Sequence, residues 1–528
     1  MIHEFNLVLT PEQAANDSFL KSIAAKQLVV PETTITFLKI MKRSVDARSR
    51  NIKINLRINV YVNEPIPNAL NYSLNYANVK NKKEVIVIGA GPAGLFAAIQ
   101  LIEKGFKPIL IERGKEVKNR RRDLAAINKE HLVNPNSNYC FGEGGAGTYS
   151  DGKLYTRSTK RGDVTRVLEI FVGHGANENI LIEAHPHIGT NKLPQIIECM
   201  RETILNHGGE VHFNTRVTDF LIQENKIRGV VGVNVETNSS IEFNADAVIL
   251  ATGHSARDIF ELLHKKNILI EGKTFAMGVR VEHPQALIDS LQYHCTINEV
   301  GKKREFLPAA SYGLVHQVMG RGVYSFCMCP GGIIAPCATA AGEIVTNGWS
   351  PSKRNNPFAN SGIVVTIEAQ DYEKYKIHGP LAGMYYQKEL EQMAWEAGGK
   401  TQTAPAQRLL DFVNNKLSNQ LPEVSYQPGI QSAPLHALLP PEIGKRLQLG
   451  FIDFGKKMRG YLTNDAVIVG VESRTSSPIR IPRNDQTLQH PQIKGLYPCG
   501  EGAGYAGGIV SAAIDGQKCA TAIANLYT

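Results

Sequence analysis

A short apolar run followed by a helical pattern is the clearest signal in the chain. Residues Val85 to Ile88 are continuously apolar, which is typical of a strand buried on both faces of a parallel sheet. From Leu95 to Ile102 the apolar positions recur at intervals of three and four residues, the spacing of one helix face. The pattern predicts a buried strand and then a helix that runs to Gly105.

Further apolar runs predict more strands. Residues 107–113 form a second strand, and the run from 241 to 253 ends as another continuous apolar strand of the same parallel sheet. A short strand near residue 497 precedes a glycine-rich turn and a helix of small residues that extends to Tyr527. Residues 208–250 predict a three-strand insert, with strands at Glu210–Asn214, Val217–Gln223 and Ile227–Val235.

The first 65 residues have a different pattern. Alternating positions predict strands at 4–10, 35–44 and 52–62, and a helix at 11–28 that opens with Pro-Glu. Residues 266–485 mix strands and helices and show no clear repeat. We expect a small α+β domain at 1–65, a linker at 66–83, a sheet domain at 84–265, a substrate domain at 266–485, and a return to the sheet domain at 486–528.

Composition places the chain among ordinary globular proteins. Of its 528 residues, 43% are hydrophobic and 20% are charged, and no apolar run approaches the roughly 20 residues needed to cross a bilayer. The start carries no basic and apolar signal sequence, so we expect a cytoplasmic protein without membrane contact. The eight cysteines contain no Cys-x-x-Cys pair. We therefore expect reduced thiols and no metal site.

The glycines after the first strand form a Gly-x-Gly-x-x-Gly motif. Gly89 permits a tight turn, Gly91 lets a pyrophosphate approach the backbone, and Gly94 lets the helix pack closely on the strand. Pro92 suits the first helical position. Glu112 ends the second strand 18 residues after Gly94, close to the spacing of about 20 expected of a carboxylate that binds ribose hydroxyls. Together these features predict a dinucleotide cradle.

A second glycine-rich stretch follows a run of three arginines within residues 115–122. The segment from Gly142 to Lys153 reads Gly-Glu-Gly-Gly-Ala-Gly-Thr-Tyr-Ser-Asp-Gly-Lys, and its five glycines deny it regular structure. Such a loop is either a flexible surface tip or backbone brought close to a ligand. Beside a dinucleotide fold we favour the ligand.

Three separated motifs share one pattern: the Gly-x-Gly-x-x-Gly, the Ala251-Thr-Gly253 after an apolar strand, and the Gly500-Glu501 near the end. In this the chain resembles FAD-dependent flavoproteins of glutathione-reductase type. The resemblance implies that the first motif holds the ADP moiety, and that Glu501, where many relatives have Asp, reaches the ribityl chain. The helix from about Gly508 would then point its positive end at the flavin.

The resemblance covers nearly the whole chain. The stretches 142–153, 251–258, 280–284, 326–332 and 500–516 are similar to those of the bacterial family called uncharacterised FAD-dependent dehydrogenases, or NAD(FAD)-utilising dehydrogenases. It implies an α/β fold with a glutathione-reductase-type, Rossmann-like FAD-binding domain in discontinuous segments (84–265 and 486–528), a mixed α+β substrate domain, and a ferredoxin-like N-terminal domain. We expect the following residues to contact FAD: Gly89, Gly91, Pro92, Ala93, Gly94, Glu112, Arg113, Arg121, Gly145, Ala146, Gly147, Thr148, Ala251, Thr252, Gly253, Gly500, Glu501, Gly508 and Ile509.

The expected function is that of an FAD-dependent oxidoreductase, a dehydrogenase or reductase, acting on a small molecule. No second Gly-x-Gly-x-x-Gly is present for a nicotinamide, so NADH or NADPH is expected only as a transient reductant. A hydroxylase or oxidase is the first alternative, because Gly253-His-Ser-Ala-Arg257 faintly resembles a motif of aromatic hydroxylases whose Asp is missing here. A flavin-binding RNA-associated or redox-sensing module is the second.

Three residues are candidates for chemistry. Arg280 would stabilise an anionic reduced flavin or a substrate carboxylate, and His283 would donate a proton. Cys329 and its neighbour Cys327 would form a redox pair if they lie near the flavin, although Cys-Met-Cys in an apolar stretch is more typical of buried thiols. We expect the 142–153 loop, the 280–283 strand end, the 327–332 turn and the helix near Gly508 to meet over the ring.

The distribution of charged residues along the chain adds one feature, an excess of basic residues near the start. Residues 1–83 hold 12 Lys and Arg against 6 Asp and Glu, most of the chain's net charge of +9. No aromatic-rich RNA motif accompanies this excess, and a solvated sheet edge is favoured over an RNA surface. We expect this unit to dock on the flavin domain or on a protein partner, and we expect no DNA binding.

Overall fold

A five-stranded parallel sheet assembles strands from distant parts of the chain. The computed structural model describes residues 1–66, 76–156 and 162–527; residues 67–75 of the expected linker lie outside this range. The strand order is β22-β10-β4-β5-β6, and all four pairings are parallel. The strands are β4 (Glu84–Ile88), β5 (Lys107–Ile111), β6 (Glu210–His212), β10 (Val248–Leu250) and β22 (Leu496–Pro498).

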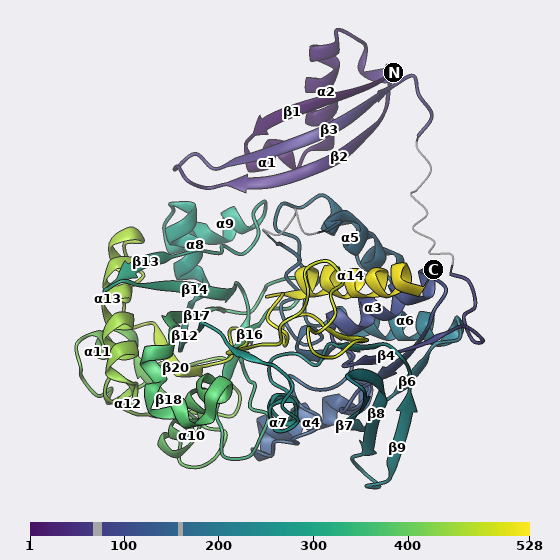
Figure 1. Ribbon diagram of the computed structural model, residues 1–528. Helices are drawn as coiled ribbons and strands as arrows, with labels where there is room; N and C mark the ends of the chain where they lie inside the picture. The colour runs from purple at the N-terminus through teal and green to yellow at the C-terminus, as the bar shows by residue number, and fades with distance from the viewer. Residues whose placement is uncertain (67–75, 157–161, 528) are drawn as a thin grey trace.

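Helix α3 (Pro92–Glu103) follows β4, and the C-terminal helix α14 (Ile509–Tyr527) packs directly against it (Figure 1). The approach is close, because a Cβ added at Gly516 would lie 2.0 Å from the carbonyl oxygen of Ala93. Helix α14 therefore packs beside α3, the helix that follows the first glycine motif, in the same layer of the structure. Other helices around this sheet are α4 (Val117–Glu130), α5 (Val164–Gly173), α6 (Leu193–Asn206) and α7 (Arg257–Lys265).

The predicted three-strand insert is present, but one of the three strands assigned to it was wrong. The segment beginning at Glu210 pairs with β5 and completes the parallel sheet. The insert consists of β7 (Thr215–Gln223), β8 (Lys226–Asn234) and β9 (Ser240–Asn244), all antiparallel. Its third strand is the start of the run from 241 to 253, which divides into β9 and the buried β10.

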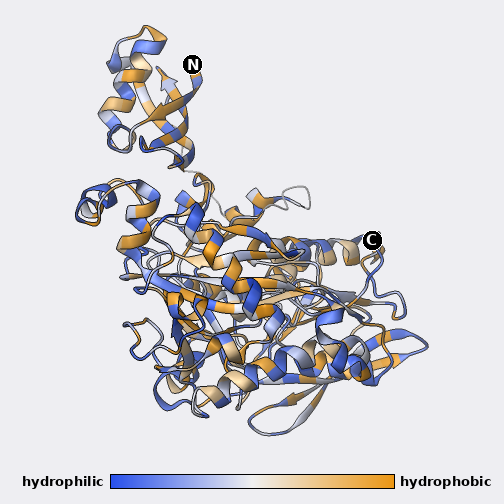
Figure 2. Ribbon diagram, turned by 90° about the vertical axis from the view of Figure 1, so that its left-hand side faces the viewer, coloured by the Kyte–Doolittle hydropathy of each residue, from blue (hydrophilic) through white to orange (hydrophobic). Residues whose placement is uncertain are grey.

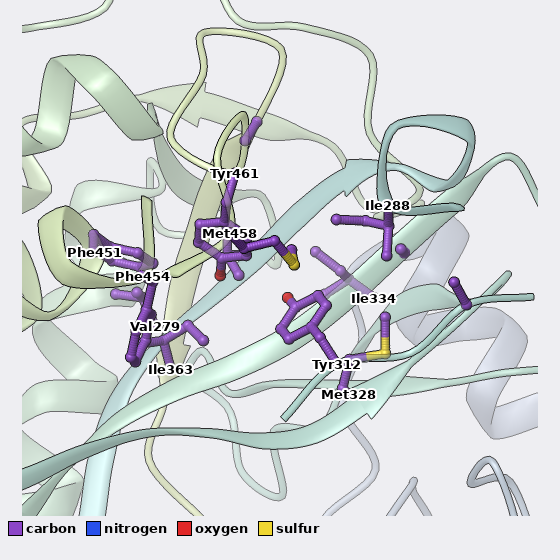
Figure 3. Close-up of a cluster of buried hydrophobic side chains, with 14 of the residues drawn as sticks. Val279, Ile288, Tyr312, Met328, Ile334, Ile363, Phe451, Phe454, Met458 and Tyr461 are labelled. Atoms are coloured by element: carbon purple, nitrogen blue, oxygen red, sulfur yellow. The ribbon is translucent and has the colours of Figure 1, made fainter. Parts of the chain in front are cut away.

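A seven-stranded sheet forms the second layer of the molecule, in the order β13-β14-β17-β12-β20-β18-β19. Figure 3 shows Phe451 and Phe454 of α13 beside Val279 of β12 and Ile363 of β17. All four side chains are fully buried, so this helix–sheet contact is a main part of the core. The elements are β12 (Phe275–Pro284), β13 (Val315–Val318), β14 (Arg321–Cys329), β17 (Phe358–Ile367), β18 (Ala404–Arg408), β19 (Ile430–Ser432), β20 (Val467–Glu472), α10 (Ala382–Ala397) and α13 (Pro441–Lys457).

Shorter elements connect these layers. They are α8 (Gln285–Tyr293), α9 (Val300–Arg304), α11 (Leu409–Val413), α12 (Leu435–Leu438), β11 (Glu271–Gly272), β15 (Ile333–Pro336), β16 (Thr346–Trp349) and β21 (Ile479–Arg480). No helix in the described ranges combines the length and the apolar character that a membrane crossing requires.

The N-terminal unit is a separate body in both views (Figures 1 and 2). Its elements are β1 (Ile2–Leu9), α1 (Pro11–Ala14), α2 (Asp17–Leu28), β2 (Ile35–Asp46) and β3 (Lys53–Val62), with antiparallel order β1-β3-β2. Within residues 1–66 it has three strands and helices from one connection, whereas a ferredoxin-like βαββαβ unit has four strands and two helical connections. The prediction of a ferredoxin-like domain therefore holds only for the first half of that βαββαβ order.

This unit contacts the rest of the chain through strand β2. The amide of Arg43 donates to the carbonyl oxygen of Ile182 at 2.8 Å, and the amide of Ala184 donates to that of Arg43 at 2.9 Å. His294 lies 3.1 Å from the carbonyl oxygen of Ala47. The expected docking on the larger body is thus made by backbone pairing at a sheet edge.

A buried arginine holds the glycine-rich loop in place. Arg120 of α4 is fully buried, and its guanidinium donates to four carbonyl oxygens at 2.8–2.9 Å, those of Asn138, Tyr139, Glu143 and Gly145. The loop has little regular structure of its own, so these bonds substitute for a strand or helix. They fix the backbone of the loop from Asn138 to Gly145.

Replacing Arg120 with Met should destabilise the protein by at least about 3 kcal/mol, because four buried carbonyl oxygens lose their donor. Urea unfolding monitored by circular dichroism measures this change. The matched control is Arg122→Met, since Arg122 lies in the same helix and is exposed; it should change stability by less than about 0.5 kcal/mol. Equal stability of the two variants would contradict the role of Arg120.

Candidate functional site

A cavity of about 900 Å³ lies between the carboxyl edge of the parallel sheet and the seven-stranded sheet. This volume is near the upper end of the roughly 300–1,000 Å³ common for ligand pockets. The wall combines the β4–α3 turn, the end of β5, the glycine-rich loop, the end of β10, part of β14 and the start of α14. Ligands of open α/β folds bind at such carboxyl edges.

The β4–α3 turn forms the cradle that the sequence predicts. Gly89 has φ +99, and a Cβ there would lie 2.5 Å from the carbonyl oxygen of Ala251. A Cβ at Gly94 would lie 1.8 Å from the carbonyl oxygen of Gly89. At Gly91 the neighbouring chain atoms leave space, with Gly145 Cα 3.9 Å away. Two glycines therefore serve packing, and the third keeps room beside the start of a helix.

The first turn of α3 is suited to an anion. Gly91 is its N-cap and provides no side-chain hydrogen bond to the first amides. Those amides and the positive end of the helix favour a negatively charged group. The open space over Gly91 is where such a group fits.

Glu112 holds the turn and the glycine-rich loop together. Its carboxylate accepts hydrogen bonds from the amides of Ala90 at 2.9 Å, Gly114 at 2.8 Å and Gly142 at 2.9 Å. The side chain also lines the cavity. A carboxylate has about four acceptor positions, so three are already used by the backbone. Besides any ribose contact, Glu112 has a structural role that its spacing did not predict.

One part of the cavity wall is partly apolar. Arg113 stacks on Phe141, with its guanidinium carbon 4.3 Å from the ring centroid, and pairs with Asp258 at 3.0 Å. These side chains lie in the wall together with Thr215 and Val217 at the start of β7. The arrangement suits a planar aromatic base.

The middle of the cavity is formed by the ends of β10 and β22. Gly253 has φ +73 and open space where a Cβ would lie. His254 Nδ1 lies 3.5 Å from Glu501 Oε1, and both residues line the cavity. Gly508, just before α14, also has open space at its Cβ position. Backbone is thus exposed to a ligand along this side.

The opposite end carries charged and sulfur-containing side chains. Asp151, Lys153, Cys327 and Arg354 all line it. Asp151 is 1% exposed and pairs with Arg354 at 2.9 Å and with Lys153 at 3.6 Å. Lys153 Nζ lies 3.8 Å from the sulfur of Cys327. This end is polar, in contrast to the aromatic end at Arg113.

Most of the predicted cofactor residues line the cavity: Gly89, Gly91, Pro92, Ala93, Glu112, Arg113, Gly145, Ala146, Gly147, Ala251, Thr252, Gly253, Glu501, Gly508 and Ile509. Four are not part of that wall: Gly94, Arg121, Thr148 and Gly500. Thr148 is buried and donates to the carbonyl oxygen of Glu143, and Gly500 donates to Asp515. Arg121 is exposed, because the helix turns Arg120 inward.

The candidate catalytic residues are not part of the wall either. Arg280 is fully buried and pairs with Glu472 at 3.0 Å, although it reaches the cavity indirectly by donating to the carbonyl oxygen of Cys327 at 2.7 Å. His283 is fully buried, its Nε2 lies 2.8 Å from the carbonyl oxygen of Tyr461, and burial lowers its pKa to about 4. A neutral imidazole among core residues has a structural role, and the proton-donor hypothesis for His283 is not supported.

Cys329 is likewise buried, and its thiol donates to the carbonyl oxygen of Cys327 at 3.2 Å. Cys327 is the sulfur that lines the cavity. The sequence named Cys329 as the candidate for chemistry, whereas the structure places its neighbour Cys327 at the cavity. Sequence reasoning also missed Arg120, whose signal is helical phase: the buried residues of α4 are Val117, Arg120, Leu124 and Ile127.

One buried group resembles a metal site. The ligand atoms of Cys499, Asp515 and Cys519 lie within 4.8 Å of one another. However, Asp515 pairs with Arg483 at 2.6 Å and accepts from the amide of Gly500. The guanidinium supplies the positive charge that these groups require.

Comparisons with known proteins agree with this geometry. Residues 84–120 match the FAD binding domain family, residues 191–304 the FAD dependent oxidoreductase family, and residues 274–475 the FAD-dependent protein, C-terminal domain-like family. Residues 1–61 match a domain of unknown function. The cradle, the open space at Gly91 and the stacked Arg113 and Phe141 side chains fit an FAD molecule.

Individual relatives extend these matches. An uncharacterised protein of Clostridium beijerinckii is 39% identical over 522 residues, 95% of each chain. A digeranylgeranylglycerophospholipid reductase of Methanosarcina mazei is 29% identical over 188 residues, 34% of this chain and 41% of that protein. The structure of the flavin-dependent brominase Bmp2 covers 84% of this chain and 78% of its own at 13% identity, with a TM-score of 0.37. By its full-length relative and its matched domains, the chain belongs to the family of FAD-dependent oxidoreductases.

Proposed function

We propose that this protein is a dehydrogenase or reductase that passes hydride or electrons through noncovalent FAD to or from a small molecule. The observation that carries the proposal is one continuous cavity with a dinucleotide cradle at one part and charged side chains at another. A site with two distinct parts suits a cofactor and a second reactant. NADH or NADPH is proposed as a transient reductant.

The residues that would hold FAD follow from the wall. The first turn of α3 would bind the pyrophosphate, and the Arg113–Phe141 pair would face the adenine. Backbone at Gly145–Gly147 and at Gly508 would lie against the flavin part, where glycine permits close approach. The bound flavin would supply two-electron transfer, and the protein would orient the reactants and exclude water.

Replacing Gly91 with Val should abolish FAD binding. The backbone there has φ −74, which any residue adopts, and the chain leaves room for a side chain. The variant should therefore fold normally and lose cofactor because the added methyl groups occupy the pyrophosphate space. Flavin absorbance per protein measures this loss.

The control for this experiment is Gly301→Val, a glycine with open space around its Cβ position and outside the cavity wall. It should keep its full flavin content. Equal flavin content in the two variants would contradict the cradle assignment, and a colourless wild-type protein that does not take up added FAD would contradict the cofactor itself.

Anaerobic mixing with NADH or NADPH should bleach the bound flavin within seconds, and reoxidation in air should be slow. This outcome separates a dehydrogenase or reductase from the hydroxylase or oxidase alternative, because an oxidase would return to the oxidised spectrum rapidly with peroxide release. Stopped-flow absorbance measures both steps. A screen of metabolites against the reduced enzyme then identifies the electron acceptor.

We also propose that the basic N-terminal unit serves a protein partner in addition to its docking on the larger body. Its basic charge suits an acidic protein surface, and the absence of an aromatic-rich RNA motif in the sequence favours a protein over a nucleic acid. The full chain should therefore bind single-stranded RNA weakly, in gel-shift titrations at physiological salt. Tight RNA binding that weakens steeply with added salt would contradict this proposal.

A further inference from the structure

Two cysteine sulfurs share one lysine at the polar end of the cavity. Cys327 and Cys329 are two residues apart in β14, and both sulfurs lie near the same ammonium group. Lys153 Nζ lies 3.8 Å from the sulfur of Cys327 and 3.6 Å from that of Cys329. Arg280 Nη2 lies 3.6 Å from the sulfur of Cys329. Two cations therefore surround two thiols.

The two sulfurs differ in access. Cys327 is partly exposed and lines the cavity, whereas Cys329 is fully buried. The backbone of Cys327 is left-handed, with φ +47, and the pairing of β14 with β17 is interrupted between Phe326 and Cys329. A left-handed conformation is costly for a residue other than glycine and is common at functional sites. Here it occurs at the cysteine that reaches the cavity.

The charges favour one thiolate at Cys327. Its hydrogen-bonded neighbour Cys329, together with Lys153 and Arg280, lowers the pKa of Cys327 well below the ordinary value despite burial and the nearby Asp151. Burial and the adjacent Cys327 sulfur raise the pKa of Cys329 well above it. The surroundings thus favour the thiolate at Cys327 over the thiolate at Cys329.

We propose that Cys327 and Cys329 form a thiol–disulfide exchange site for a small-molecule disulfide, with Cys327 as the attacking thiolate and Cys329 as the resolving thiol. The site lies in the part of the cavity that FAD's cradle does not occupy.

The exchange has two balanced steps. The Cys327 thiolate attacks one sulfur of the substrate disulfide, which forms a mixed disulfide and releases one substrate thiolate. Cys329 then attacks the Cys327 sulfur, which forms the Cys327–Cys329 disulfide and releases the second substrate thiolate, and that thiolate takes up the proton of Cys329. The substrate gains two electrons and the cysteine pair loses two.

Lys153 links these steps as a positioning residue. While Cys327 is anionic, the ammonium stabilises it, and once Cys327 is in a mixed disulfide Cys329 is the remaining thiol of the pair beside the same ammonium. The second thiol then becomes easier to ionise. Repeated turnover rests on the proposed function, since reduced flavin is the two-electron donor that would return the pair to the dithiol.

The test uses the full-length protein with its bound cofactor and hydroxyethyl disulfide as the probe. Intact-mass measurement of the wild type should show loss of two hydrogens and no lasting adduct. Cys329→Ser should trap one mixed disulfide at Cys327, and Cys327→Ser should remain unmodified. Cys295→Ser, at a partly buried cysteine outside the cavity wall, is the matched control and should behave as wild type.

A second measurement follows the rate against pH. At pH 7 iodoacetamide should modify Cys327 about tenfold faster than Cys295, because an ordinary thiol is only a few per cent thiolate there. In Lys153→Met the pH midpoint of this reaction should move upward, with Arg280, Arg354 and Asp151 unchanged around the sulfur. If Lys153 served packing alone, the pH midpoint of the iodoacetamide reaction would not change in Lys153→Met.

The proposal is overturned if the Cys329→Ser protein forms no adduct, if the wild-type adduct persists unresolved, or if Cys327 reacts no faster than Cys295. Failure here is distinguishable from failure of the flavin function, because these readouts are masses and labelling rates at the cysteines. A yellow protein that NADH bleaches but that does not exchange disulfides would keep the oxidoreductase and remove this site.

Discussion

Two buried charges hold the glycine-rich loop against the cradle. The Arg120 guanidinium binds four carbonyl oxygens of the loop, and the Glu112 carboxylate binds three amides from the turn, the strand end and the loop. The cationic Arg120 thus satisfies backbone acceptors, and the anionic Glu112 satisfies backbone donors. A loop with so many glycines has high conformational entropy when free. Its ordered position depends on these bonds, and the cavity wall depends on the loop.

The sequence predicted correctly those elements that depend on residues close together in the chain. The strand, turn and helix from Glu84 to Glu103 were readable because apolar run, glycine spacing and helical periodicity lie within 20 residues. The strand at Glu210–His212 was assigned to the wrong sheet because its partner β5 lies about a hundred residues earlier. Three residues of strand contain too little alternation to identify that partner.

The orientation of side chains was harder to predict. Nine of the ten residues of β12 are buried, so hydrophobic alternation does not separate its two faces, and Arg280 and His283 were both assigned to the ligand. Helical periodicity was a signal for the burial of Arg120, because Arg120 shares the helical phase of Leu124 and Ile127. The choice between Cys327 and Cys329 depended on a left-handed residue and an interrupted ladder, which no pattern in the sequence reveals.

The sheet around the cradle has a consequence for synthesis of the chain. Strand β4 pairs with β10, β10 pairs with β22, and α14 then covers α3. During translation the glycine motif emerges about 400 residues before the strand and helix that complete its surroundings. The small N-terminal unit, whose pairings lie within 62 residues, can fold while the ribosome is still at work. Retention of the cofactor has to wait until almost the whole chain has been made.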